Sequence, residues 1–234
     1  MAPAYFDSLG SKLYNYRNYT EALDYFNKSA DQDPAYVNAW VHKGDTQKTL
    51  RDYNGSIESY NQALKANNKT ATAWSGLIDA YSANKDYANA SLAAAKVTNL
   101  NPKNKASWLK EGQLLQVQGR YFESAAKFDG ALALDSNYKD ALYGKALTDI
   151  SLGNDSQALD LLNQVLSQDI KNKNAYNAEG LALMHMGRYS EALDAYNNAL
   201  KIDPKWSQAL NNKMHALLAL GKREEAMNIF LSIK

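Results

Sequence analysis

The feature that most constrains the fold of this chain is internal repetition with a period of 34 residues. Segment 187–204, GRYSEALDAYNNALKIDP, matches segment 17–34, RNYTEALDYFNKSADQDP, at an offset of 170 residues. Such repetition predicts a stack of similar supersecondary units, in which each unit buries its apolar face against its neighbours. Without insertion or deletion, the repeats are 3–36, 37–70, 71–104, 105–138, 139–172, 173–206 and a shortened 207–234.

Several repeat positions keep one kind of side chain along the chain. Position 4 is large, position 8 is mostly glycine, position 20 is always small, and position 24 is mostly aromatic. Positions 4, 8 and 11 recur at helical spacing, as do positions 20, 24 and 27, so each repeat is predicted to form two helices. The residues at position 4 are Phe6, Trp40, Trp74, Trp108, Leu142, Tyr176 and Leu210.

The segment between the two predicted helices carries signals for a helix end and a helix start. Glycine at position 15 favours the positive φ with which many helices end. A hydroxyl or amide side chain two or three residues later can cap the helix that follows. The glycines are Gly119, Gly153, Gly187 and Gly221, and the predicted N-caps are Thr20, Asn54, Ser156 and Ser190.

These columns resemble the tetratricopeptide repeat (TPR) family, whose motif has an aromatic residue at position 4, Gly at 8, Ala at 20, an aromatic at 24 and Pro at 32. The resemblance covers residues 3–234. It implies an all-α fold, a right-handed α-solenoid superhelix of antiparallel helix pairs forming one array over 3–234. It also implies a concave groove lined by the first helices, faced by positions 2, 5, 6, 9, 12 and 13.

Composition and motifs argue against several other classes of protein. The net charge of +1, with 26 basic and 25 acidic residues, is atypical of nucleic-acid binding. The absence of cysteine removes thiolate metal sites and a cysteine nucleophile. The sequence carries no phosphate-binding loop, nucleophile-turn motif or metal-binding histidine spacing, and no membrane-length apolar run. We therefore expect no enzymatic activity, no catalytic residues, no metal site, no cofactor and no membrane span.

The groove positions of the last three repeats are the candidate binding site. Positions 9 and 12 are mostly apolar there, whereas earlier repeats carry Asp, Ser, Lys and Gln in the same columns. A continuous exposed apolar strip usually marks a binding surface, and neighbouring amides can bond a peptide backbone. The alternative is that the strip is buried between repeats at a tighter curve. The predicted peptide-binding groove consists of Tyr143, Leu147, Ile150, Asn177, Leu181, Met184, His185, Asn211, His215 and Leu218.

A secondary, polar part of the groove is predicted in the N-terminal half. It consists of Asp45, Lys48, Asp79 and Lys110. No three consecutive repeats supply the set of Lys, Asn and Arg residues with which some family members hold a C-terminal carboxylate.

The Met-His-Met run at residues 184–186 could suggest a soft-metal site, because thioether and imidazole are ligands that Cu(I) favours. On a helix, however, Met184 and Met186 point about 200° apart, so their sulfurs cannot meet at one ion. A cluster of Met184, His185 and His215 is the one remaining form of such a site. We predict instead that Met184 faces the groove.

The leading functional hypothesis is a non-catalytic scaffold that binds a peptide or helical segment of a partner protein. One alternative is self-assembly through the C-terminal edge, where Ile229, Phe230 and Ile233 are expected to be incompletely covered. Another is a regulatory or substrate-binding domain of a larger enzyme, since the last repeat is shortened as in a piece of a longer protein. A cytoplasmic location is expected, although six Asn-x-Ser/Thr triplets leave export open.

Overall fold

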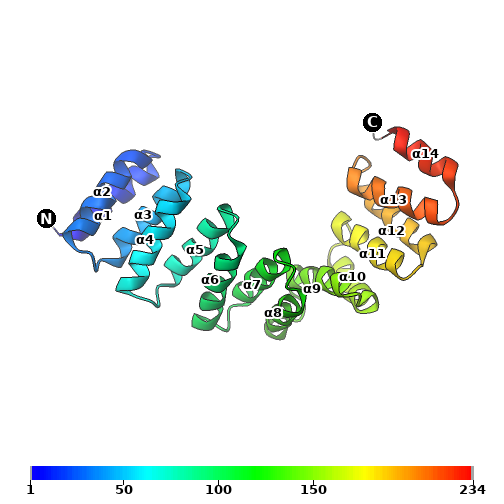
Figure 1. Ribbon diagram of the computed structural model, residues 1–234, viewed down its shortest axis with the longest axis horizontal. Coiled ribbons are helices and arrows are strands. Elements are labelled where there is room, and N and C mark those ends of the chain that lie inside the picture. The colour runs from blue at the N-terminus through cyan, green and yellow to red at the C-terminus, as the bar shows by residue number, and fades with distance from the viewer. Residues whose placement is uncertain (1, 233–234) are drawn as a thin grey trace. The chain divides into compact units, whose positions relative to one another are not determined.

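The computed structural model describes residues 2–232, which form fourteen helices and no strands (Figure 1). Contacts group the chain into two compact units, Met1–Gln118 and Gly119–Lys234, called unit 1 and unit 2. Unit 1 contains α1 (Pro3–Asn15), α2 (Tyr19–Gln32), α3 (Val37–Thr49), α4 (Tyr53–Ala66), α5 (Ala71–Ala83), α6 (Tyr87–Leu100) and α7 (Lys105–Val117). Unit 2 contains α8 (Tyr121–Leu134), α9 (Lys139–Leu152), α10 (Asp155–Gln168), α11 (Lys173–His185), α12 (Tyr189–Ile202), α13 (Ser207–Ala219) and α14 (Arg223–Ser232).

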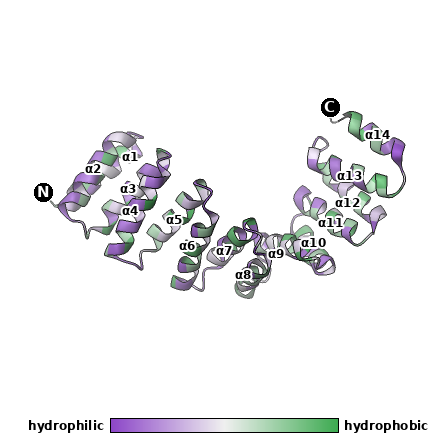
Figure 2. Cartoon of the chain, viewed as in Figure 1, coloured by the Kyte–Doolittle hydropathy of each residue, from purple (hydrophilic) through white to green (hydrophobic). Residues whose placement is uncertain are grey.

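Within each unit, every helix packs against the next helix in the chain. The first helices of successive repeats also touch one another, as α1, α3 and α5 do in unit 1 and α9, α11 and α13 do in unit 2. Figure 2 shows hydrophobic and hydrophilic residues interspersed along these helices, as expected when one stripe of each helix is buried. The helix pairs predicted from the 34-residue period are confirmed. That all seven repeats form one continuous array stays a prediction.

The first helix of each repeat ends at position 15 with positive φ, as predicted for the four glycines there. Their φ values are +73° at Gly119, +78° at Gly153, +72° at Gly187 and +75° at Gly221. In unit 1 the same position is occupied by Arg17, Arg51 and Lys85, with φ values of 62°, 64° and 60°. The repeat therefore imposes one turn geometry even on residues that rarely adopt it.

The predicted N-caps of the second helices are wrong by two residues. Thr20, Asn54, Ser156 and Ser190 each lie at the second residue of a helix, and the cap is the residue at position 16. Asp52 illustrates the true cap, because its side chain accepts a hydrogen bond from the Gly55 backbone N–H at 3.0 Å. The positive-φ residue reverses the chain so sharply that only one residue remains before the next helix begins.

The core of each unit depends on aromatic rings that lie against glycines. Tyr60 of α4 is fully buried, and a Cβ built on Gly44 or on Gly76 would lie 2.8 or 2.2 Å from its ring. Phe128 of α8 is packed in the same way against Gly144 of α9. Glycine on the first helices therefore makes the space that a large ring on the second helix fills.

Tryptophan side chains at position 4 fix the turns between repeats in unit 1. The indole N–H groups of Trp40, Trp74 and Trp108 donate to the backbone carbonyl oxygens of Pro34, Asn68 and Pro102, at 2.9, 2.9 and 2.8 Å. Each ring thereby packs beside the turn while its polar N–H is satisfied.

Candidate functional site

The predicted groove residues lie on the first helices, and we call the surface carried by these helices the first-helix face of each unit. Among the first helices of unit 1, α1, α3 and α5 contact one another and carry this face, as α9, α11 and α13 do in unit 2. Contacts between side chains of neighbouring first helices show that each face is continuous within its unit. Examples are His42 with Asp7 in unit 1 and Asn212 with Asn177 in unit 2.

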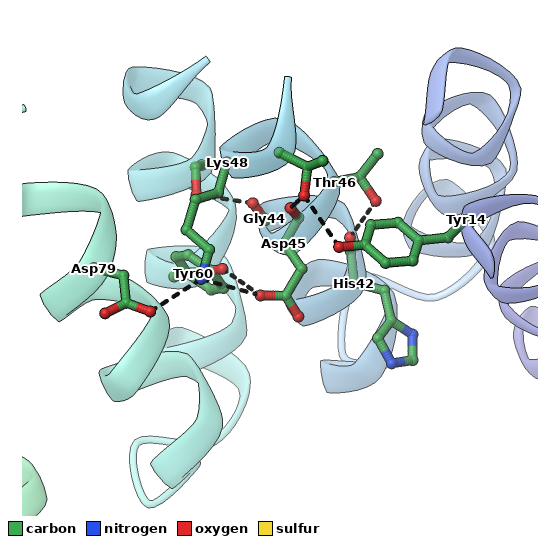
Figure 3. A network of polar contacts seen from close by, with 10 residues as sticks. Tyr14, His42, Gly44, Asp45, Thr46, Lys48, Tyr60 and Asp79 are labelled. Atoms are coloured by element: carbon green, nitrogen blue, oxygen red, sulfur yellow. Dashed lines mark hydrogen bonds and ion pairs between the residues drawn. The ribbon is translucent and has the colours of Figure 1, made fainter. Parts of the chain in front are cut away.

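The first-helix face of unit 1 is a network of polar side chains bonded to one another (Figure 3). Lys48 of α3 lies between two carboxylates, with its Nζ 3.2 Å from Asp79 of α5 and 3.7 Å from Asp45. The Tyr60 hydroxyl donates to Asp45 at 2.6 Å, and burial of the phenol together with this bond raises the pKa of Tyr60. Three of the four residues predicted as the polar groove are therefore joined in one cluster.

Lys110, the fourth predicted polar residue, lies on α7 of the same unit. With Asp79 it lines a small pocket of about 220 Å³ between α5, α6 and α7. A separate pocket of about 320 Å³ opens between α1 and α3, and Phe26 and His42 are among its lining residues. Sequence reasoning did not single out either pocket.

His42 connects α3 to α1. Its Nδ1 lies 2.7 Å from Asp7 Oδ1, and its ring packs beside Phe26 with centroids 5.4 Å apart. The hydrogen bond to Asp7 raises the pKa of His42 above 6.5; burial opposes this shift, and the charges of Asp7 and Asp45 add to it. Sequence reasoning missed this pair, although its signal is simple: complementary side chains at positions 5 and 6 of consecutive repeats.

We expect the stability of the parent protein to depend on the protonation of His42. Because the pKa is raised on folding, the pair stabilises the folded state fully below pH 6.5, and this contribution is lost as the pH rises through the raised pKa of folded His42. NMR titration of the His42 ring protons, with urea unfolding at acidic and alkaline pH, measures both effects. In Asp7→Asn the titration should move down toward 6.5. A parent His42 that titrates at or below 6.5 contradicts the assignment.

The first-helix face of unit 2 carries the apolar residues of the predicted groove. Leu147 and Leu181 are partly exposed and pack against the buried cluster around Leu142 and Leu162, and Met184 packs similarly beside Leu183. Tyr143 packs against the same cluster and is also partly exposed. Its partial burial raises the pKa of the phenol. These apolar side chains are thus partly exposed and partly covered by packing against the core. Leu218 on α13 is 48% exposed, and Asn211 and His215 are exposed as well.

Two residues of the predicted groove, one from the apolar strip and one from the amides beside it, are buried and are not exposed to a ligand as predicted. Ile150 is 6% exposed and belongs to the core of unit 2. Asn177 is also buried, and its Oδ1 accepts a hydrogen bond from Asn212 Nδ2 at 2.9 Å. Ile150 is covered by the packed core of unit 2, and Asn177 lies against Asn212 of the neighbouring first helix α13.

His185 has a polar partner on a neighbouring helix. Its Nδ1 lies 3.1 Å from Asp155 Oδ1, a contact that connects α11 to the start of α10. Within residues 2–232, no group of three or more His, Asp or Glu side chains is placed to hold a metal ion. In that same range, no helix is long and apolar enough to cross a membrane.

The last helix exposes apolar side chains at the C-terminal edge. Met227 and Leu231 are 57% and 62% exposed, and Phe230 is about half exposed. Ile233, which was also predicted to be incompletely covered, lies outside the described residues.

The chain is similar to curated proteins over part of their length. It is 27% identical over 135 residues to the mouse protein named Superkiller complex protein 3, a match that covers 55% of this chain and 9% of that protein. The chain thus spans about a tenth of the length of this relative.

Two solved structures share the fold over most of the chain. A tetratricopeptide repeat protein from Parabacteroides merdae superposes with a TM-score of 0.73 at 16% identity, covering 99% of this chain and 91% of that one. YrrB, described as a TPR protein with an unusual peptide-binding site, superposes with a TM-score of 0.70 at 19% identity, covering 80% of this chain and 97% of that one.

Models of one family match three parts of the chain. All three are described as tetratricopeptide repeat, and they match residues 37–70, 109–173 and 174–205. The matches agree with the repeat boundaries, the helix pairs and the α-solenoid folds of the superposed structures. The chain belongs to the tetratricopeptide repeat family.

Proposed function

We propose that this chain is a non-catalytic scaffold that binds a peptide or helical segment of a partner protein on the first-helix face of unit 2. One observation carries the proposal. Consecutive first helices present apolar side chains at positions 9 and 12, with Leu181, Met184 and Leu218 as examples, where unit 1 presents polar side chains bonded to one another. Partly exposed apolar residues on adjacent helices fit an apolar peptide or one face of an amphipathic helix.

The surroundings of these residues fit the same proposal. Asn211 and His215 are exposed beside the apolar side chains and can bond the polar groups of a bound backbone. Met184 has a flexible thioether, which adapts to ligands of different shape. The similar protein YrrB is described as having a peptide-binding site, which supports a peptide as the class of ligand.

Leu218→Glu is expected to weaken peptide binding by at least about tenfold, because a carboxylate would be desolvated against apolar ligand side chains. Peptides selected from a random displayed library on the parent protein supply the probes, and fluorescence anisotropy measures their dissociation constants. The substitution is preferable to Leu181→Glu, since Leu181 packs against the core and its loss would also destabilise the fold.

Leu92→Glu is the matched control. It makes the same chemical change at a residue that is 63% exposed on α6 of unit 1, outside the proposed surface. It should leave the dissociation constants unchanged. Equal affinity of parent and Leu218→Glu for every selected peptide would refute the assignment of this face.

Self-association is a second candidate, favoured by the exposed Met227 and Leu231 on α14. Apolar side chains at a helix surface of this kind can be covered by another protein chain. Sedimentation of the parent across a range of concentrations distinguishes the two candidates, because a protein that stays monomeric while binding peptide supports the scaffold alone.

A further inference from the structure

A cleft of about 440 Å³ lies between the second helices α10 and α12, with α11 beneath them. Its apolar lining comes from Leu159 of α10, Leu183 of α11 and Ala195 of α12. Leu183 and Leu181 are two residues apart on α11 and so point about 200° apart, which places this cleft away from the first-helix face. The function proposed above does not use the cleft.

The charged residues that line the cleft are mostly acidic. Arg188 is the one cation among the lining residues, and its guanidinium donates two hydrogen bonds to Glu191, at 2.7 and 2.5 Å. Asp160, Glu179 and Asp194 line the cleft without a basic residue to pair with them there. Burial raises the pKa of Glu179, as expected for a carboxylate whose charge is not offset by a nearby cation.

The preceding repeat shows how the equivalent position is used when it carries the opposite charge. Lys145 on α9 stands 34 residues before Glu179, at position 7 of its repeat. Its Nζ forms an ion pair with Asp129 of α8, so a lysine side chain reaches from the first helix to the neighbouring second helix. Position 7 is also lysine at Lys43 and Lys213. The repeat geometry therefore accommodates an ammonium group where the α10–α12 cleft has a carboxylate and open space.

We propose that the α10–α12 cleft docks a basic segment of a partner protein and takes one lysine or arginine side chain from it. The aliphatic part of that side chain would pack on Leu159, Leu183 and Ala195, and its charged end would lie among Asp160, Glu179 and Asp194. Charge complementarity selects this partner chemistry over an acidic or purely apolar segment. The interaction weakens with added salt, because part of the attraction is between exposed charges.

The test uses the whole chain and a fluorescein-labelled decapeptide of alternating glycine and lysine, with a glycine–glutamate peptide of equal length for comparison. Anisotropy at low salt should show that the lysine peptide binds and that the glutamate peptide does not. Glu179→Lys should weaken this binding by at least about tenfold, because the new ammonium group occupies the cleft and repels the ammonium groups of the peptide. This variant is expected to fold, since lysine already occupies position 7 in three other repeats.

Asp24→Lys is the matched control. Asp24 is exposed on α2 of unit 1, so the substitution makes the same change in net charge far along the chain from the cleft. It should leave the affinity for the lysine peptide unchanged. The proposal is overturned if the parent does not prefer the lysine peptide, if Glu179→Lys binds it like the parent, or if the two variants lose affinity equally. The peptides and variants that test the first-helix face are different, so either proposal can fail alone.

Discussion

Phe128→Ala is expected to lower the free energy of unfolding by about 3–5 kcal/mol. Phe128 is 0% exposed, and its ring lies so close to α9 that a Cβ on Gly144 would be 2.6 Å from it. Removing the ring takes away its transfer free energy and leaves a cavity, which the glycine on the facing helix cannot fill. Urea unfolding followed by circular dichroism, fitted with a nearest-neighbour repeat model, measures the loss.

The same helix supplies a matched control for this substitution. Phe122 also lies on α8 and is 81% exposed, so Phe122→Ala should change the unfolding free energy by less than about 0.5 kcal/mol. Both substitutions remove one phenyl ring and leave alanine in a helix. Equal effects of the two would mean that the burial of Phe128 does not determine its contribution. The comparison separates a packing effect from any general effect of the substitution.

The sequence predicted the helix pairs well because the apolar columns and the small residues repeat in register. It failed at the helix starts, since Thr20 and Ser190 are good capping residues that stand two positions too late. It also overlooked Arg17, Arg51 and Lys85, which adopt positive φ although their side chains disfavour it. In both cases the geometry of the repeated turn overrides the local preference of the residue.

The candidate site was predicted less completely than the fold. Repeat position identifies which helix face a residue is on, and the apolar change at positions 9 and 12 is visible in the sequence. Exposure depends in addition on tertiary packing, which buries Ile150 in the core of unit 2 and places Asn177 against Asn212. The bond between His42 and Asp7 and the α10–α12 cleft depend on side chains from different repeats. A sequence read column by column does not show such combinations.

Glycine at position 8 and the aromatic residue at position 24 pack against each other in several repeats. Gly10 faces the ring of Phe26, Gly44 faces the ring of Tyr60, and Gly180 faces the ring of Tyr196. In the third repeat both residues change together, because Ile78 replaces the glycine and Ala94 replaces the ring, and both remain buried. The total volume between the two helices is thereby kept, which is the kind of exchange that protein cores tolerate.

Gly44→Ile alone is therefore expected to destabilise the protein by about 3 kcal/mol, because the added side chain meets the fully buried ring of Tyr60. In a Tyr60→Ala background the same substitution should cost less than about 1 kcal/mol, since the double variant carries the pair already present at Ile78 and Ala94. Urea unfolding of the parent, the two single variants and the double variant completes the cycle. Additive losses would contradict the coupling, whereas a double variant close in stability to Tyr60→Ala would confirm that the ring and the glycine define one packing site.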